Sequence, residues 1–328
     1  MNLRKSLPLI VVIRQFGGIG DFLMMSPVFR GLKEKYPKNP IRLVTSAQYM
    51  GGTLITMAQH FFGIDQIWDV DPVQYTTDRT RVVQGKWYAK SKEILYEKCC
   101  EGAERVIDLN NSCLDYELPM SRKRVPVDKP RDRIWCEAAG VEPSSYSPTY
   151  TITSDERAWA AKYFKDRNWE GKKIIGVSCL SKDKDRSLPE AKYIELLQRL
   201  VARGFTPVVI DRDRAITGVE CFTGHRIECV FPVVERMQGV VSVDSGIMHI
   251  AGTVRTPVVG IFGPTDPAMR MGEYYGSAID SRALVPCAPC WYERPCTHQG
   301  QPHAGQFLCL QRTPLSLVVD ETERFITT

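Results

Sequence analysis

Two short polar stretches of the sequence contain residue types that could do chemistry, and each follows an apolar run. The first, residues 14–21, places three glycines before Asp21. The second is Asp244-Ser245-Gly246, with His249 three residues further on. A carboxylate can take a proton from a hydroxyl group, and a helix start presents unpaired N–H groups to an anion. The two stretches together predict base chemistry and an anion-binding turn.

The first stretch is predicted to be a turn between a strand and a helix. Residues 7–13 are apolar and rich in β-branched side chains, and apolar residues recur at helical spacing after Asp21. Gly17, Gly18 and Gly20 let the backbone turn sharply and let another molecule approach it closely. Asp21 then lies above the carboxyl end of the strand, where open α/β sheets bind ligands. The structural alternative is that Asp21 only caps the helix.

The second stretch has the same predicted order of strand, turn and helix. Ser245 and Gly246 begin a helix whose N–H groups and dipole favour a phosphate group. His249 lies on the first turn of that helix and could add a hydrogen-bond donor. The structural alternatives are a helix cap for Asp244 and an ordinary core or surface position for His249.

Strands and helices alternate along both halves of the chain. Strands are expected at residues 7–13, 40–45, 66–70, 105–109, 173–178, 206–210, 227–231, 239–243 and 257–262. Helices are expected at residues 52–62, 87–100, 134–139, 154–169 and 189–203, and another should begin with Thr313 as cap and Pro314 at its first position. This alternation predicts an α/β protein with two doubly wound Rossmann-like domains facing across a cleft.

Composition narrows the class of protein. The 328 residues are 43% hydrophobic and 25% charged, as in a globular protein, and no stretch is apolar over the length of a membrane span. The net charge of +5 suits an anionic ligand or surface. The basic stretch at residues 120–133 has no interleaved aromatic residues, so we interpret it as a solvated loop and do not expect a nucleic-acid partner. The glycine spacing also differs from the GxGxxG of a dinucleotide site.

Residues 14–32, 243–249 and 256–267 together resemble glycosyltransferase family 9, the family of ADP-heptose:lipopolysaccharide heptosyltransferases. The resemblance covers nearly the whole chain and is weakest at about residues 73–118. It implies a GT-B fold with an acceptor-binding domain at 1–150, a nucleotide-sugar domain at 151–312 and a C-terminal helix at 313–328 packing back toward the N-terminal domain. It also implies inverting transfer of a heptose-like sugar from a nucleotide-diphosphate donor, with ADP-heptose the expected one, and no cofactor for catalysis.

Carried over residue by residue, the resemblance gives the motifs their roles. Asp21 matches the catalytic base. Arg186 occupies the position of a phosphate-binding lysine, which exchanges a point charge for a planar fork. With no convincing Asp-x-Asp metal loop, a helix start and cations must stabilise the leaving diphosphate. The full set of expected donor-binding residues is Gly18, Gly20, Ser181, Lys182, Arg186, Asp244, Ser245, Gly246 and His249.

Four of the eleven cysteines lie close together near the end of the chain. Cys287, Cys290, Cys296 and Cys309 have the spacing C-x2-C-x5-C-x12-C, and four thiolates can bind zinc or iron tetrahedrally. The surrounding segment has little apolar content to hold it folded, which favours a structural metal over reduced thiols. In the resembling family some members carry such a group, and in the autotransporter heptosyltransferases it binds iron. The other cysteines are scattered, which favours a reducing compartment.

The sequence leaves the acceptor open. A glycan, a glycolipid such as a lipopolysaccharide core, a protein side chain or a modified nucleobase would each supply a nucleophile. A nucleotide-sugar epimerase with the GT-B fold is the alternative enzyme class. We expect a cytoplasmic protein, either free or peripheral at the inner face of the membrane.

Overall fold

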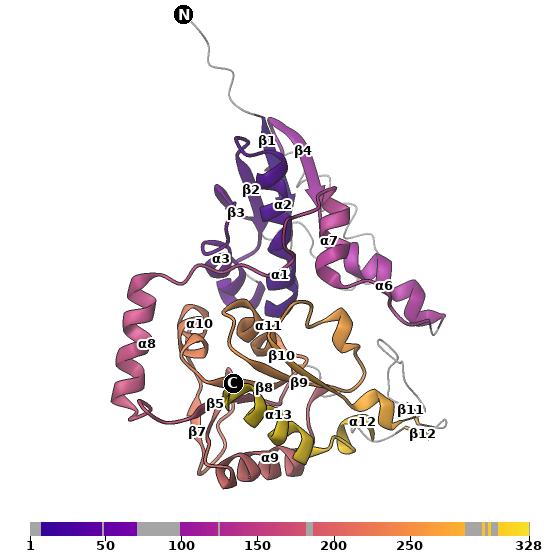
Figure 1. The fold of residues 1–328 in the computed structure, drawn as a ribbon. Coiled ribbons are helices and arrows are strands. Elements are labelled where there is room, and N and C mark those ends of the chain that lie inside the picture. The colour runs from indigo at the N-terminus through magenta and orange to yellow at the C-terminus, as the bar shows by residue number, and fades with distance from the viewer. Residues whose placement is uncertain are drawn as a thin grey trace, which may run out of the picture. The chain divides into compact units, whose positions relative to one another are not determined.

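The computed structural model describes residues 8–47, 49–70, 99–123, 125–181, 186–285, 297–298, 301–302 and 308–327 (Figure 1). They form two compact units that interleave along the sequence. Unit 1 draws on residues 1–113, 132–145 and 149–151, and unit 2 on residues 114–131, 146–148 and 152–328. Residues 114–131 lie in unit 2, whereas the expected boundary near residue 150 places them in the first domain. The functional assignment of the two domains stays a prediction.

Unit 1 is built on a parallel sheet with the strand order β3-β2-β1-β4 (Figure 1, indigo to magenta). The central strand β1 has its last four side chains buried, as its unbroken apolar sequence predicts. The phenylalanine rings of α1 and α2 pack against Phe61, with centroids 5.3 and 6.4 Å away. The elements are β1 (Leu9–Ile13), α1 (Ile19–Met25), α2 (Pro27–Lys35), β2 (Ile41–Thr45), α3 (Thr53–Ala58), β3 (Gln66–Asp69), β4 (Ala103–Asp108) and α7 (Arg131–Ala139, from Asp132 onward).

Unit 2 contains a parallel six-stranded sheet with the order β10-β9-β8-β5-β6-β7 (Figure 1, magenta to yellow). Its strands are β5 (Ile174–Ser178), β6 (Thr206–Ile210), β7 (Glu220–Phe222), β8 (Gly239–Val243), β9 (Val258–Phe262) and β10 (Gly276–Asp280). Its helices are α6 (Ser112–Arg122, from Leu114 onward), α8 (Ser154–Asp166), α9 (Glu190–Ala202), α10 (Ile227–Glu235), α11 (Gly246–Thr253), α12 (Leu308–Gln311) and α13 (Leu315–Thr327). A short antiparallel pair, β11 (Thr297–His298) and β12 (Gln301–Pro302), completes the described strands.

The topology of each sheet explains where the two polar stretches lie. In unit 1 the chain leaves β1 for β2 on one side and later adds β4 on the other. In unit 2 it leaves β5 for β6 and later returns to place β8 on the opposite side of β5. Such reversals of strand order open a crevice at the carboxyl ends of the strands. Residues 14–21 follow β1, and Asp244 follows β8, so each stretch lies at such a point.

Three expectations about secondary structure were wrong. Residues 227–231 begin the helix α10, not a strand, because a short buried apolar run fits either element and Pro232 disfavours a central strand. The expected loop at 120–133 includes the end of α6 and the start of α7. Helix α3 ends at Ala58 and is preceded by Gly52 at a φ of 83°, so it is shorter than residues 52–62. The expected helix at 87–100 lies almost wholly outside the described residues.

The C-terminal helix starts later than its sequence suggests. Helix α13 begins at Leu315, and the carbonyl of Pro314 accepts a hydrogen bond from Val318 N–H, so Pro314 precedes the first turn. The Thr313 hydroxyl pairs with Ser281 at 2.9 Å and is not the cap. Helix α13 packs against α9 and the sheet of unit 2, with Val318 and Val319 in its core. A role in tying the two domains together stays a prediction.

Candidate active site

The glycine stretch of unit 1 turns at Gly17. This residue has a φ of 143°, which side chains other than hydrogen rarely allow, and a Cβ placed on it would lie 2.6 Å from Arg14 Nη2. Gly18, by contrast, has an ordinary φ of −74° as the residue before α1, and Gly20 is buried inside that helix. The expectation that all three glycines serve the sharp turn was therefore wrong for Gly18 and Gly20.

The Arg14 side chain anchors this turn to the segment after β4, a role that the sequence did not suggest. Its side chain is buried, and Nη1 donates hydrogen bonds to the carbonyl oxygens of Leu109 and Asn110, just after β4. The guanidinium group also lies 5.2 Å from the centre of the Trp135 ring. Gln15 N–H donates to the Asn110 side chain at 2.8 Å. These contacts fix the loop against the end of the neighbouring strand.

Asp21 is the third residue of α1, and it is half-buried. Its Oδ2 accepts a hydrogen bond from Gly18 N–H at 3.2 Å, so the capping geometry that was the structural alternative is present. A cap of this kind uses one lone pair of one oxygen, while a carboxylate has two oxygens that accept protons. Capping and base catalysis are therefore compatible in one carboxylate, and the catalytic role of Asp21 stays a prediction.

The second polar stretch lies across the carboxyl ends of β5 and β8, which pair directly. Ser245 is the residue before α11, and its hydroxyl lies 3.0 Å from that of Ser242, which donates to the carbonyl of Ser178 on β5. Ser181 is buried, and its N–H donates to the Ser187 hydroxyl at 2.9 Å. Lys182 lies outside the described residues.

Asp244 is the centre of a buried cluster of charges. Its side chain is 4% exposed, and Arg186 Nη1 lies 3.2 Å from Oδ2 and 3.1 Å from the main-chain oxygen. Arg270 Nε lies 3.8 Å from Oδ2, and His249 Nε2 lies 3.9 Å from Oδ1. Burial alone would raise the pKa of Asp244. The His249 ring and the two guanidinium groups outweigh it and hold the pKa of this carboxyl well below its usual range.

His249 is fixed in place on α11. Its Nδ1 lies 2.8 Å from the Tyr274 hydroxyl, and its side chain is 3% exposed. The Tyr274 ring packs directly on Gly252, where any Cβ would lie 2.4 Å from ring atoms. The absence of a side chain at Gly252 thus leaves room for Tyr274 to reach the histidine. His249 is a buried residue beside Asp244, and direct contact of His249 with a donor stays a prediction.

The charges continue away from Asp244 through residues that sequence reasoning missed. Arg270 Nη1 lies 3.3 Å from Glu117 Oε1. Glu117 on α6 in turn accepts two hydrogen bonds from Arg131, at 2.8 and 2.6 Å. The Glu117 side chain is fully buried. Three arginines and two carboxylates alternate along this chain of contacts, from Arg131 to Arg186.

Of the four cysteines of the predicted metal site, only Cys309 lies within the described residues. It is buried in α12, where a Cβ placed on Gly263 after β9 would lie 3.1 Å from its Sγ. Across the described parts of the chain, no three His, Cys, Asp or Glu side chains are grouped to hold a metal ion. Cys287, Cys290 and Cys296 fall outside those parts, so the metal site stays a prediction.

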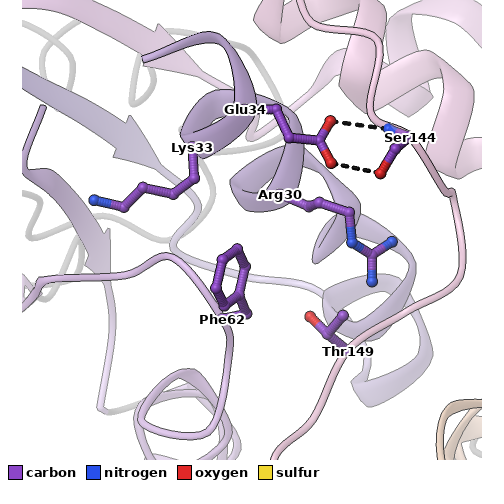
Figure 2. A pocket seen from close by; sticks show the side chains of 6 residues that line it. All are labelled: Arg30, Lys33, Glu34, Phe62, Ser144 and Thr149. Atoms are coloured by element: carbon purple, nitrogen blue, oxygen red, sulfur yellow. Dashed lines mark hydrogen bonds between the residues drawn. The ribbon is translucent and has the colours of Figure 1, made fainter. Parts of the chain in front are cut away.

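A separate surface pocket of about 410 Å³ lies in unit 1. Figure 2 shows Glu34 turned to Ser144, whose N–H and hydroxyl donate to its carboxylate, with Arg30 and Phe62 facing the same space. The cations of the pocket have protein partners, since Arg30 donates to the Ser145 carbonyl and Lys33 pairs with Asp65 at 2.7 Å. No residue of the predicted site lines this pocket, which is formed by Arg30, Lys33, Glu34, Phe62, Ser144 and Thr149.

None of the described helices combines the length and the apolar character needed to cross a bilayer.

The family model of glycosyltransferase family 9 (heptosyltransferase) matches residues 72–300, so the chain belongs to this family. Its class as a glycosyltransferase, which the sequence motifs predicted, is thereby confirmed. A curated relative, lipopolysaccharide heptosyltransferase 1 of Pseudomonas aeruginosa, is 30% identical over 122 residues. That alignment covers 34% of this chain and 34% of the relative, about a third of the length of each.

Two kinds of solved structure match along most of the chain. A glycosyl transferase family 9 protein from Veillonella parvula has a TM-score of 0.69 at 16% identity, with 98% of each chain covered. The iron-containing dodecameric heptosyltransferase TibC of enterotoxigenic E. coli, in complex with ADP-D-beta-D-heptose, has a TM-score of 0.67 at 15% identity, with 98% of this chain and 77% of that one covered. The predicted GT-B class, with two parallel α/β domains, is confirmed by this likeness in fold.

Proposed function

We propose that the protein is an inverting glycosyltransferase that moves a heptose-like sugar from ADP-heptose to a hydroxyl group of an acceptor. The observation that carries the proposal is the cluster around Asp244, at the start of α11 and the carboxyl ends of β5 and β8. It combines a helix start, a partly exposed guanidinium group and an ionised carboxylate in one place. Those are the groups that a diphosphate and a sugar bearing hydroxyl groups require.

The donor is assigned to this cluster from its exposure and charge. Arg186 is its most exposed charged member, at 25%, so its guanidinium fork is the part that a diphosphate can reach. The N–H groups at Ser245 and Gly246 face the same end of α11. The Asp244 carboxylate accepts hydrogen bonds from sugar hydroxyls in this proposal. The name of the TibC complex, which contains ADP-D-beta-D-heptose, supports ADP-heptose as the donor.

The proposed reaction is a single displacement. The Asp21 carboxylate takes the proton of the acceptor hydroxyl as that oxygen bonds to the anomeric carbon, and the bond from that carbon to the diphosphate oxygen breaks. Attack from the opposite face inverts the anomeric configuration. Negative charge then grows on the departing ADP, where Arg186 and the start of α11 stabilise it. Asp21 removes the proton, and Arg186 with the start of α11 stabilises the leaving diphosphate, so no cofactor takes part in this step.

For the acceptor we propose a lipopolysaccharide-type glycan or glycolipid, because the Pseudomonas relative is named a lipopolysaccharide heptosyltransferase. An ADP-sugar donor and the scattered distribution of the other cysteines fit an enzyme of the cytoplasm. An acceptor on a protein or a nucleobase would share the same donor site.

We also propose a structural zinc or iron ion held by Cys287, Cys290, Cys296 and Cys309. Four thiolates are the ligand set that both metals accept, and TibC is named as iron-containing. Cys309 lies in the core of unit 2, so a metal bound there would tie residues 287–296 to that core. The ion has no part in the transfer step.

A product assay tests the function. Purified protein is incubated with ADP-heptose and a lipopolysaccharide core that lacks heptose, the added mass is measured by mass spectrometry, and the configuration of the products is determined by NMR. One heptose added per acceptor, joined with the anomeric configuration opposite to that of the donor, is the expected result. Conversion of ADP-heptose to a stereoisomer without an acceptor would instead identify an epimerase. Tight donor binding with heptose added only to protein or nucleobase acceptors would replace the proposed acceptor.

A further inference from the structure

A continuous row of charged side chains leads into Asp244 from a distant part of the sequence. Arg131 binds Glu117 through two hydrogen bonds, and Glu117 contacts Arg270 at 3.3 Å. Arg270 then reaches Asp244 at 3.8 Å. The charges alternate in sign at each step. The interior members are almost wholly buried, with side-chain exposures of 0% for Glu117, 5% for Arg270 and 4% for Asp244.

The burial of these charged side chains needs an explanation, because it does not by itself stabilise the fold. A carboxylate removed from water loses its hydration, and an ion pair often recovers only what that removal costs. Apolar side chains of similar volume would fill the same space at no loss of stability. Charged residues in the interior are therefore better explained by what they hold in place. The row ends on Asp244, the carboxylate at the centre of the candidate donor site.

We propose that Glu117 and Arg270 are positioning residues that hold the Asp244 carboxylate in place for the donor. Glu117 comes from α6, between β4 and α7, and Arg270 follows β9, so neither belongs to the β8–α11 turn. Both lie in unit 2, as does Arg131 at the far end of the row. The inference rests on the proposed function, since it assigns these residues to the donor site of that function.

The distances around Asp244 indicate different tasks for Arg186 and Arg270 when the donor binds. Arg186 and Arg270 share one oxygen of Asp244, at 3.2 and 3.8 Å. When a diphosphate draws Arg186 toward itself, Arg270 continues to balance the buried carboxylate. Without Arg270, the buried Asp244 carboxylate would lose one of its charged partners and its fixed position, which the sugar hydroxyls of the donor require. Glu117 keeps Arg270 oriented for this task.

A first experiment needs no donor. His249 Nε2 faces Asp244 Oδ1 at 3.9 Å, so the NMR signals of the His249 ring report the position and charge of that carboxylate. The chain has five histidines, and loss of one signal in His249→Gln assigns it. Glu117→Gln and Arg270→Gln should each shift the His249 signals in the folded, ligand-free protein. Unchanged His249 signals in both variants would overturn the inference, whatever the donor is.

The matched control is Glu235→Gln. Glu235 forms a two-bonded pair with Arg157, at 2.9 Å for both bonds, between α10 and α8 of the same unit. Its loss removes a two-bonded but more exposed Arg–Glu pair from the same unit without touching the row. His249 signals should not move in this variant. A shift as large as in Glu117→Gln would show that the signals respond to stability in general, and the assignment would fall.

A second experiment measures binding by calorimetry for Glu117→Gln, Arg270→Gln and the double variant, with ADP-heptose and ADP as ligands. Each single change should weaken ADP-heptose binding about tenfold and ADP binding less than about threefold, within the range for residues that act through a neighbour. The double variant should lose no more than Arg270→Gln, because Glu117 acts through Arg270. Losses that multiply, or equal losses for both ligands, would contradict the positioning role.

The two proposals fail in different ways. If Asp244→Asn binds ADP-heptose as tightly as the wild type does, the donor assignment of the proposed function is wrong. If Asp244→Asn loses ADP-heptose while Glu117→Gln and Arg270→Gln bind normally and keep their His249 signals, only the positioning role is wrong.

Discussion

Replacement of Arg186 by alanine removes the most exposed cation of the Asp244 cluster. Its side chain is 25% exposed, and Nη1 bonds both the carboxylate and the main-chain oxygen of Asp244. Arg270 and His249 remain beside Asp244 in the variant, so the buried carboxylate keeps two partners. We therefore expect the variant to fold.

The size of the effect follows from the kind of contact that is lost. Hydrogen bonds to a charged group contribute about 1.5–3 kcal/mol, which corresponds to a roughly 10- to 150-fold change in Kd. Since a quarter of the Arg186 side chain is open to water, some of its charge is screened. The loss for ADP-heptose should lie in the lower half of that range. Adenosine lacks the diphosphate and should lose little.

Calorimetric titration of ADP-heptose, ADP and adenosine against both proteins gives the comparison. Arg157→Ala is the control, since it removes an arginine with a two-bonded carboxylate partner from the same unit and leaves the cluster intact. The control should bind all three ligands normally. Equal losses for adenosine and ADP-heptose in Arg186→Ala would refute the reasoning, because they would place Arg186 at the nucleoside or in folding.

Other changes test separate parts of the structure. Gly17→Ala forces a side chain into a φ of 143° and against Arg14, so chemical denaturation should show a loss of at least about 1–3 kcal/mol in the free energy of unfolding. Gly18→Ala, where the nearest atom to the new Cβ is 3.7 Å away, should lower it only slightly. Equal losses in the two variants would contradict the turn geometry. The stability that ionised Asp244 contributes is fully present above its unfolded-state pKa of about 3.9 and is lost as the pH falls toward its depressed native pKa. Acid titration of stability should therefore be steeper for the wild type than for Asp244→Asn, by up to about 1.4 kcal/mol per pH unit, and equal slopes would show that folding does not lower the pKa of Asp244. Chelation of the proposed zinc or iron should release one ion per chain and lower the melting temperature, whereas four freely titratable thiols in untreated protein would rule the metal out.

Much of the fold follows from local sequence patterns. The strands β1, β5, β6, β8 and β9 are unbroken apolar runs, and such runs bounded by turns specify a parallel sheet covered on both faces. The two candidate turns were found for the same reason, since glycine and aspartate after a buried strand mark its carboxyl end. Helix α10 was missed because its apolar sequence fits a buried strand equally well over five residues.

The rest of the candidate site depends on contacts that local patterns do not contain. Arg270 and Glu117 are 153 positions apart, and Glu117 lies on a helix with mixed polar and apolar residues. No spacing rule links such residues, and a charged side chain on a helix is ordinarily a solvent-exposed one. The one available signal was Arg270 itself, a few residues after the strand β9. Arg14 likewise stands beside the glycines, yet only the structure shows its guanidinium under Gly17.

The central claim is that Asp21 is the base of a sugar transfer, and Asp21→Asn tests it most directly. Asparagine retains an oxygen that can accept from Gly18 N–H, so the cap at the start of α1 survives the change. Transfer of heptose from ADP-heptose to the acceptor should fall by about a hundredfold or more, the usual size of a general-base contribution, with the Kd for ADP-heptose and the melting temperature close to those of the wild type. Transfer at the wild-type rate would reduce Asp21 to a helix cap and contradict the account.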